Sequence, residues 1–315
     1  MYNTIPDILR KEAVTSLLNT ETLQRVWPIW QQEIGNYIGN NYNENSLIDL
    51  GDHLGDIFRS TGVAGRDQGA LSSGGTAWES LVCWYINLCT AGSRVVAFRT
   101  MSKVPKPIQD ATTINYANFA CNTESDITVV VFPNAQQYNV AAPQLNISDN
   151  TGRRINPLKR NGMMNPALID FLTEVDFAQF EVGVIQCKTN WNDNAQIPML
   201  WDMVYSAGGF RGRNITIGRN NFTVQNLPSF TYSFATVPSN TRANYTQNSV
   251  AVKRVTNLSG GNYWGQPTQG NVAKSLKEIF TNNFASGARV TLRDDLRNGL
   301  NEFAGNGEFE YFRLL

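Results

Sequence analysis

The residues best suited to chemistry in this chain begin with Gln186 and Lys188, at the end of the apolar stretch FEVGVIQCK. This stretch predicts a buried strand, and successive side chains of a strand point to opposite faces of a sheet. Gln186 and Lys188 therefore share one face, and Cys187 points to the other face, into the core. A half-buried lysine costs free energy unless an anion lies near it. A plainer interpretation is that Lys188 extends to water and Gln186 binds a neighbouring backbone group.

Two acidic residues are candidates for that anion. Asp126 stands at the start of the apolar strand DITVVVF, a position that strand propensity disfavours for aspartate. Glu79 lies on a helix predicted over residues 76–90, at the margin of its apolar face, while the solvated side of the helix is expected near Asn87. The apolar face is centred on Trp78, Val82, Tyr85 and Cys89. A carboxylate at this margin requires a cation or a strong donor; the alternative is that Glu79 forms a capping box with Thr76.

These residues occur in a recognisable order: an acid on a helix, a strand, a strand led by aspartate, a Gln-x-Lys strand and a further helix. The order Glu79, Asp126, Gln186 and Lys188 resembles the PD-(D/E)xK nuclease superfamily, the fold of most restriction endonucleases. Glutamine in place of the motif glutamate is similar to the Mrr-type and related branches. The resemblance covers about residues 78–206, the middle of the chain.

The resemblance implies a fold and a division of the chain. The expected fold is α/β, with a restriction-endonuclease-like mixed β-sheet flanked by helices. Residues 1–75 are expected to form an N-terminal helical region, for which dimerisation and DNA contact are both considered. Residues 76–315 would form the nuclease domain, with a long insertion over 133–178.

The resemblance also implies a function, type II restriction endonuclease activity: magnesium-dependent, site-specific hydrolysis of double-stranded DNA. Asp126, Gln186 and Glu79 would bind Mg²⁺, which prefers oxygen ligands, and Lys188 would stabilise the charge that develops on the phosphate. A homodimer would cut both strands, in the cytoplasm, beside a DNA methyltransferase of the same restriction–modification system. The alternatives are a modification-dependent or antiviral nuclease of the same fold, a non-catalytic DNA-binding module and a coat-like structural protein.

The spacing departs from the family, because 60 positions separate Asp126 from Gln186. Asp176 is closer to Gln186, but it ends the predicted helix NPALIDFLTEV and no two-strand turn follows it. We therefore expect Asp126 to be the ligand and the extra length to be an insertion between two paired strands. Glu124 and Asp176 remain open as further metal ligands.

Several basic and amide residues are candidates for DNA contact, since arginine, lysine and asparagine bind phosphates and base edges. The candidates are Arg153, Arg154, Lys159, Arg160, Asn190, Asn192, Arg211 and Arg213. Tyr263 and Trp264 could stack on a base, although such pairs more often pack a loop. A solvated loop is the plainer interpretation for any one of these charges.

The composition of the chain disfavours several kinds of function. The 315 residues carry no net charge, and the pI is near 6.6, so bulk charge does not favour coating of nucleic acid or acidic membranes. The single histidine, His53, leaves little room for a Ser-His-Asp or histidine-rich metal site. The four cysteines form no CxxC pair, which disfavours zinc and redox sites. No secretion signal or long apolar span is evident, so no membrane partner is expected.

Periodicity outlines the elements that must position these residues. Helices are expected within 5–60 and over NAQIPMLWDMVYSA and NVAKSLKEIFTNNFA, with strands over SRVVAFRT, RNITIGR and SFTYSFATV. Helices followed by mixed strands and helices indicate an α/β or α+β domain with an N-terminal helical part.

Overall fold

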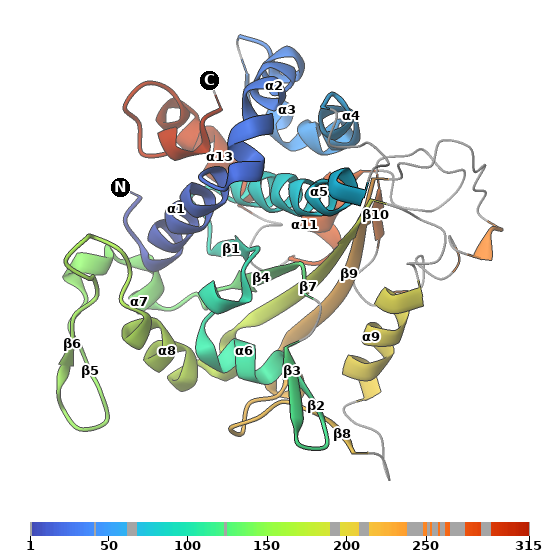
Figure 1. Ribbon diagram of the computed structural model, residues 1–315. Helices are drawn as coiled ribbons and strands as arrows, with labels where there is room; N and C mark the ends of the chain where they lie inside the picture. Colours follow the sequence, from blue (N-terminus) through green and yellow to red (C-terminus); the bar gives the residue numbers. More distant parts are fainter. Residues whose placement is uncertain are drawn as a thin grey trace.

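A central mixed β-sheet organises the protein (Figure 1). The computed structural model describes residues 2–40, 42–61, 68–122, 125–189, 196–207, 214–237, 248–250, 253, 258, 262–264, 275–284 and 291–314, of which 68–73, 196–199, 207 and 262–264 are described by their backbone. The sheet order is β1 (Val95–Phe98), β4 (Ile127–Val131), β7 (Glu181–Lys188), β9 (Ser229–Thr236) and β10 (Asn262–Trp264). The pairs β1–β4 and β4–β7 are antiparallel, whereas β7–β9 and β9–β10 are parallel.

Both faces of this sheet are covered, which explains why β1 and β4 are continuous apolar runs and β7 is apolar over most of its length. All five residues of β4 are buried. Ile127, Val129 and Ile185 pack with helix α5 (Gln68–Cys89) on one face. Val182 and Val184 pack on the other face. That face is covered by α6 (Lys106–Thr112), α8 (Pro166–Val175) and α9 (Gln196–Ala207).

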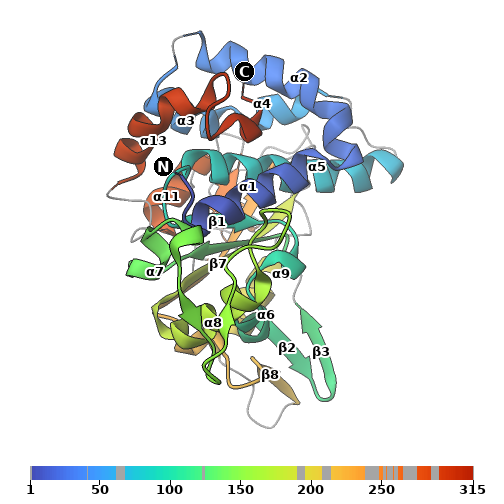
Figure 2. The ribbon, with the colours of Figure 1, turned by 90° about the vertical axis from the view of Figure 1, so that its left-hand side faces the viewer.

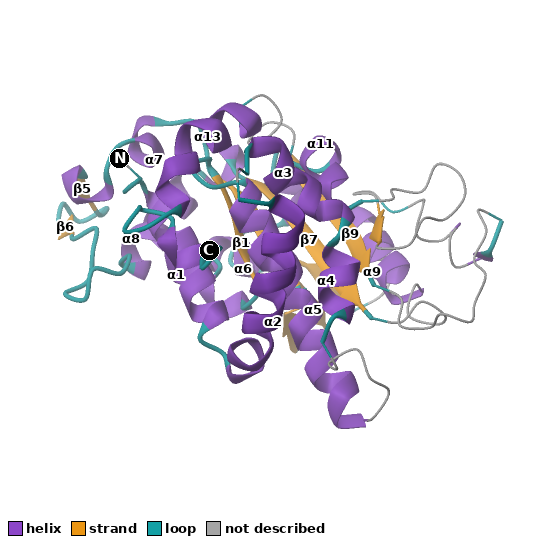
Figure 3. Ribbon diagram, turned by 90° about the horizontal axis from the view of Figure 1, so that it is seen from above, coloured by secondary structure: helices purple, strands orange, loops and turns teal. Residues whose placement is uncertain are grey.

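Helix α5 lies between the sheet and a further helical layer (Figures 2 and 3). That layer contains α2 (Glu21–Ile38), α3 (Glu44–Asp49), α4 (Leu54–Arg59) and α13 (Leu292–Gly299). Helices α1 (Ile5–Leu18) and α11 (Ile279–Asn282) lie beside α5. Trp78, Trp84 and Tyr85 of α5 are at most 2% exposed. A helix with apolar residues around most of its circumference is stable only when buried in this way. The N-terminal helices thus share one core with α5 and the C-terminal segment.

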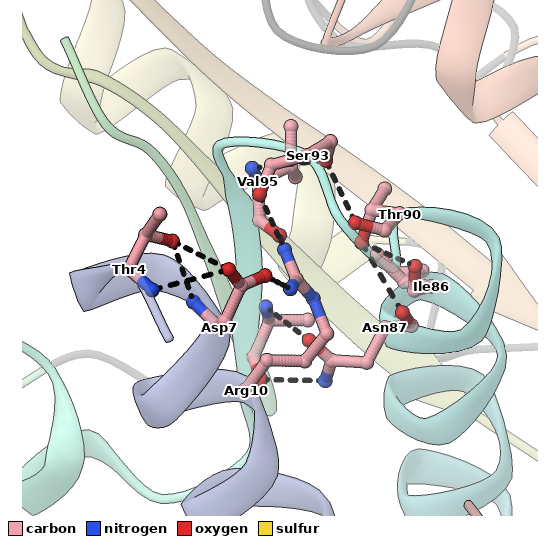
Figure 4. Close-up of polar contacts among 9 residues, drawn as sticks. Thr4, Asp7, Arg10, Ile86, Asn87, Thr90, Ser93 and Val95 are labelled. Carbon is pink, nitrogen blue, oxygen red and sulfur yellow. Dashed lines mark hydrogen bonds and ion pairs between the residues drawn. The ribbon is translucent and has the colours of Figure 1, made fainter. Parts of the chain in front are cut away.

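Two polar side chains fix α1 and α5 to β1, the outermost strand of the described sheet (Figure 4). The buried Arg10 guanidinium binds Asp7 at 2.9 Å and donates to the carbonyl oxygens of Ser93 and Val95 at 2.6 and 2.9 Å. The Asn87 amide donates to the Ala97 carbonyl at 2.9 Å and accepts from the Ala97 N–H at 3.0 Å. Asn87 therefore satisfies backbone groups that a neighbouring strand would otherwise pair.

The segment between β4 and β7 is a long insertion, and its helix α8 packs on one face of the sheet. It contains α7 (Gln136–Asn139), the short hairpin β5 (Ile147–Ser148) and β6 (Arg154–Ile155), and α8. Because β4 and β7 are directly paired, this segment is inserted between two neighbouring strands.

A second, three-stranded sheet is formed by β3 (Phe119–Asn122), β2 (Thr113–Tyr116) and β8 (Ile215–Ile217). Single turns of 3₁₀ helix lie at Leu50–Asp52, Met101–Lys103, Ala142–Gln144, Phe177–Gln179, Val224–Asn226, Leu276–Glu278, Leu300–Phe303 and Glu310–Phe312. None of the described helices combines the length and the apolar character needed to cross a bilayer.

The mixed α/β class, with helices on both faces of a mixed sheet, is confirmed. Three details of the expected elements were wrong. Helix α5 begins at Gln68 and crosses position 75, so Thr76 is inside a helix and does not cap one. Asn87 is fully buried instead of solvated. A helix is predicted over NVAKSLKEIFTNNFA. In the part of this stretch that the structure describes, a 3₁₀ turn is followed by the short helix α11 alone.

Candidate functional site

Charged side chains lie together at one end of the sheet, where three neighbouring strands begin or finish. Arg99 directly follows β1, Asp126 directly precedes β4 and Lys188 ends β7. Because β4 is antiparallel to both of its neighbours, these three strand termini lie at the same end of the sheet. Glu79 belongs to α5, which covers one face of the sheet.

Asp126 is anchored beside the Gln-x-Lys segment. One of its carboxylate oxygens, Oδ2, accepts a hydrogen bond from the backbone N–H of Cys187 at 2.6 Å. Asp126 is half-buried and lies just outside the ladder that pairs Ile127 with Ile185. An aspartate that is unfavourable inside a strand is thus held at the strand entrance by a backbone donor from the neighbouring strand.

Gln186 and Cys187 point to opposite faces of β7, as the alternation predicts. Cys187 packs in the same apolar cluster as Ile185, and burial, followed by the charge of Asp126, raises the pKa of its thiol well above the usual value. Gln186 is fully buried, and its carbonyl oxygen accepts from the Tyr232 hydroxyl at 3.2 Å. Tyr232 thereby fixes the direction of the amide.

Glu79 forms an ion pair with Arg99 at 3.3 Å, and the two side chains are 22% and 23% exposed. Burial and the nearby charge of Asp126 raise the pKa of Glu79 to about 7, although the charges of Arg99 and Lys188 act in the opposite direction. Two carboxyl groups and two cations therefore interact in one half-buried region. The capping-box interpretation of Glu79 is excluded because Thr76 lies inside α5 and does not cap it.

Arg99 was not among the sequence candidates. Its signal in the sequence is the same as that of Asp126: a charged residue at the end of an apolar strand, here VVAF. A single arginine in that position is common at strand ends, so only the ion pair with Glu79 distinguishes it.

The donor set suits a hard divalent cation. Asp126 and Glu79 offer carboxylate oxygens and Gln186 offers an amide oxygen, the ligand types that Mg²⁺ prefers. Gln186 lies on the face of β7 opposite to the one that α5 covers, whereas Glu79 belongs to α5. Within the described ranges, no three His, Cys, Asp or Glu side chains are grouped as a metal site. The candidate set differs from such a group because one of its three members is a glutamine.

Asp176 lies at the other end of β7. It caps the C-terminus of α8 and accepts hydrogen bonds from Gln137 at 2.6 Å and the Tyr138 hydroxyl at 2.9 Å. It precedes Glu181, the first residue of β7, whereas Lys188 is the last residue. Since a strand rises about 3.3 Å per residue, about 23 Å of strand separates Glu181 from Lys188. Asp176 does not join the site.

The basic candidates are also separated from the site. Arg153, Arg154, Lys159 and Arg160 are exposed on the β5–β6 hairpin and the turn after it. In Figure 1 this hairpin is at the lower left, whereas β7 runs towards β10 on the right. Glu124, Asn190, Asn192, Arg211 and Arg213 are outside the described residues, as are the side chains of Tyr263 and Trp264.

No family model, curated protein or solved structure matches this chain. The class of protein must therefore be argued from the geometry of the fold and the site.

Proposed function

We propose that this protein is a magnesium-dependent endonuclease that hydrolyses phosphodiester bonds of double-stranded DNA, in the manner of a type II restriction endonuclease. One observation carries the proposal: the Asp126 carboxylate is bonded to the backbone N–H between Gln186 and Lys188. This bond supports the proposal because Asp126 lies beside the segment of the adjacent strand that carries the Gln186 amide and the Lys188 ammonium group.

The order of elements supports the proposal. After helix α5, the strands of the main sheet follow in the order β1, β4 and β7, each antiparallel to the one before, and β9, parallel to β7, comes after helix α9. Helix α6 and strands β2 and β3 lie between β1 and β4 in the chain, and β8 lies between α9 and β9. The PD-(D/E)xK resemblance implies the same order: helix with an acid, strand, aspartate-led strand, Gln-x-Lys strand and helix. The insertion 133–178 lengthens the connection between β4 and β7 without changing their pairing.

Each side chain has a role that its position supports. Asp126, the Gln186 carbonyl and, when released from Arg99, Glu79 would hold Mg²⁺, which supplies charge neutralisation at a phosphate and acidifies a bound water. Lys188 would stabilise the charge that grows on the phosphate oxygens. Glu79, with a pKa of about 7, is ionised in a substantial fraction of molecules at neutral pH and can accept a proton there.

Arg99 has two roles in this proposal. In the described state it neutralises Glu79, and near a bound phosphate it can exchange that carboxylate for a phosphate oxygen, since guanidinium groups bind both. Substrate binding would then free Glu79 for the metal or for the attacking water.

Cleavage of supercoiled plasmid tests the proposal. The wild-type protein should nick or linearise the plasmid with Mg²⁺ and not with EDTA. Asp126→Asn should reduce the rate by about 100-fold or more, because it removes a charged metal ligand. Asp176→Asn is the matched control and should cut at nearly the wild-type rate. A protein that is inactive on plasmid and phage DNA with Mg²⁺, or an Asp126→Asn variant that cuts normally, would contradict the proposal.

A further inference from the structure

A cleft lies beside the β5–β6 hairpin, away from the candidate catalytic site. It has a volume of about 800 Å³ and is bounded by the β5–β6 hairpin, by α6 and α8, and by the turn around Asn220. Figure 1 shows the hairpin beside α8. Glu79, Arg99, Asp126, Gln186 and Lys188 do not line it, so a ligand bound there can be detected without any reaction at the candidate catalytic site.

The hairpin wall is cationic. Arg153 and Arg154 line the cleft, are exposed, and form no ion pair with any residue in the described ranges. The turn that carries them is held by Asp149, whose Oδ1 accepts from Thr151 Oγ1 at 2.6 Å and from the Arg153 N–H at 3.0 Å. Asp149 also lines the cleft, but its Oδ1 is engaged in this turn, so Arg153 and Arg154 are the cations that this wall offers to an anion.

The α8 wall is acidic. Asp170 and Glu174 are four residues apart, so they lie on the same side of the helix, and both line the cleft. The Oδ1 atom of Asp170 accepts from the backbone N–H of Lys106 at 2.8 Å. Its second oxygen accepts no hydrogen bond from the part of the chain that the structure describes. Burial raises the pKa of this carboxyl group.

Between these walls lie two half-buried aromatic rings, Phe171 and Phe222. Phe222 also packs on Phe177, with ring centroids 4.9 Å apart. These rings offer an apolar surface on which a flat ligand can pack.

The polar base of the cleft is fixed by Asp110, which is 3% exposed. Its carboxylate accepts from Lys106 Nζ at 2.7 Å, Arg219 Nε at 2.6 Å and Asn220 Nδ2 at 2.8 Å. The charge of Asp110 is therefore compensated internally, and the groups left for a ligand are the arginines on one side and the α8 carboxylates on the other.

We propose that this cleft binds a guanine nucleotide. A ligand that fits must combine an anionic group for Arg154, a flat ring for the phenylalanines, and hydrogen-bond donors for Asp170. Carboxylates only accept hydrogen bonds when ionised, and guanine presents two adjacent donors, N1–H and N2–H, on one edge. Uracil presents a single N–H between two acceptor oxygens, which the carboxylate would repel. The same chemistry is available from a free nucleotide and from a guanine within a strand.

Equilibrium binding in EDTA tests this proposal without any cleavage. Titrations use guanosine, adenosine, cytidine and uridine 5′-monophosphates as probes, with guanylyl dinucleotide as the probe for a strand. Guanosine monophosphate should bind about tenfold or more tightly than uridine monophosphate, the discrimination expected of one two-point hydrogen-bonded contact.

Two variants test the contribution of each wall of the cleft separately. Asp170→Asn keeps an oxygen for the Lys106 N–H but removes the carboxylate, so it should abolish the guanine preference. Arg154→Gln should weaken all four monophosphates about equally and reduce the salt dependence of binding. Lys159→Gln, a basic residue of the same segment that does not line the cleft, is the matched control and should change neither. Thermal unfolding checks that each variant is folded.

The affinity for guanylyl dinucleotide, compared with that for the monophosphate, identifies the source of the ligand. Tighter binding of guanylyl dinucleotide than of the monophosphate would support a guanine within a strand, and equal or weaker binding would support a free nucleotide. The proposal is overturned if the folded wild-type protein binds no guanosine monophosphate up to ~1 mM, if all four monophosphates bind equally, or if Lys159→Gln weakens binding as much as Arg154→Gln. Plasmid cleavage can fail or succeed without affecting any of these outcomes.

Discussion

The two ends of strand β7 hold aspartates in opposite settings. Before its first residue, Asp176 accepts hydrogen bonds from three neutral donors on Gln137, Tyr138 and Gln179. At its last residue, Asp126 lies with a second carboxylate, Glu79, and with Arg99 and Lys188, and burial and the charge of Asp126 raise the pKa of Glu79 to about 7. A carboxylate with a full set of neutral donors stabilises the fold, whereas carboxylates forced together favour the binding of a cation.

The strongest test of this comparison is Lys188→Ala against Lys159→Ala. Removing the ammonium group at the C-terminal end of β7 should lower the plasmid cleavage rate by about 10³-fold, because the phosphate loses a preorganised cation. Lys159 is exposed in the turn after the β5–β6 hairpin, and its removal should have little effect. Equal rates for the two variants, measured at saturating Mg²⁺ with both proteins folded, would show that Lys188 has no catalytic role.

The next effect is on stability, through Glu79. Its pKa is about 7 in the folded protein and near 4.5 in the unfolded chain, so the folded state holds the proton more tightly. This contribution to stability is fully present below pH 4.5 and is lost as the pH rises through 7. In urea unfolding with EDTA, the wild type should lose on the order of 2–3 kcal/mol more than Glu79→Gln between pH 4.5 and 8. Parallel pH profiles for the two proteins would show that Glu79 titrates normally.

Arg99→Gln should move the pH dependence of cleavage. Arg99 lowers the pKa of Glu79, so its loss should shift the midpoint of the acidic limb upward by about one pH unit. The control is Arg94→Gln, at the other end of β1, where the guanidinium donates to the Phe132 carbonyl. That variant should lose stability and keep the midpoint. An unchanged midpoint in Arg99→Gln would mean that Glu79 does not control the rate.

The smallest expected effects come from two tyrosines, each of which donates a hydrogen bond to a residue at one end of β7. Tyr232→Phe removes the donor to Gln186 and should raise the Mg²⁺ concentration for half-maximal cleavage a few-fold, with a loss of about 1 kcal/mol in the free energy of unfolding. Tyr138→Phe removes a donor to Asp176 and should cost about 1–2 kcal/mol without changing the Mg²⁺ dependence. Identical Mg²⁺ titrations for both variants would show that Tyr232 does not orient the amide.

Much of this site could be predicted from residue types at strand ends. Gln186, Lys188 and Asp126 each interrupt an apolar strand with a polar group, and alternation correctly separates Cys187 from Gln186. Helix α5 shows where such reasoning fails. Its start was misplaced because SSGG is a poor helix former, yet α5 continues through it, since tertiary packing overrides weak local propensity. Asn87 was assigned to solvent because periodicity cannot identify which polar residue will pair with a strand.

The sequence alone determined the apolar strands, the polar residues that end them and the order of helix and strand, because these depend on periodicity over a few neighbouring positions. The tertiary structure decided what depends on contacts between distant segments. It paired β4 with β7 across a long insertion, and so placed Asp126, and not Asp176, beside the Gln-x-Lys segment. It also brought Arg99 to Glu79 and placed the basic hairpin away from both. Side-chain spacing along the chain carries no information about such distances until the sheet is assembled.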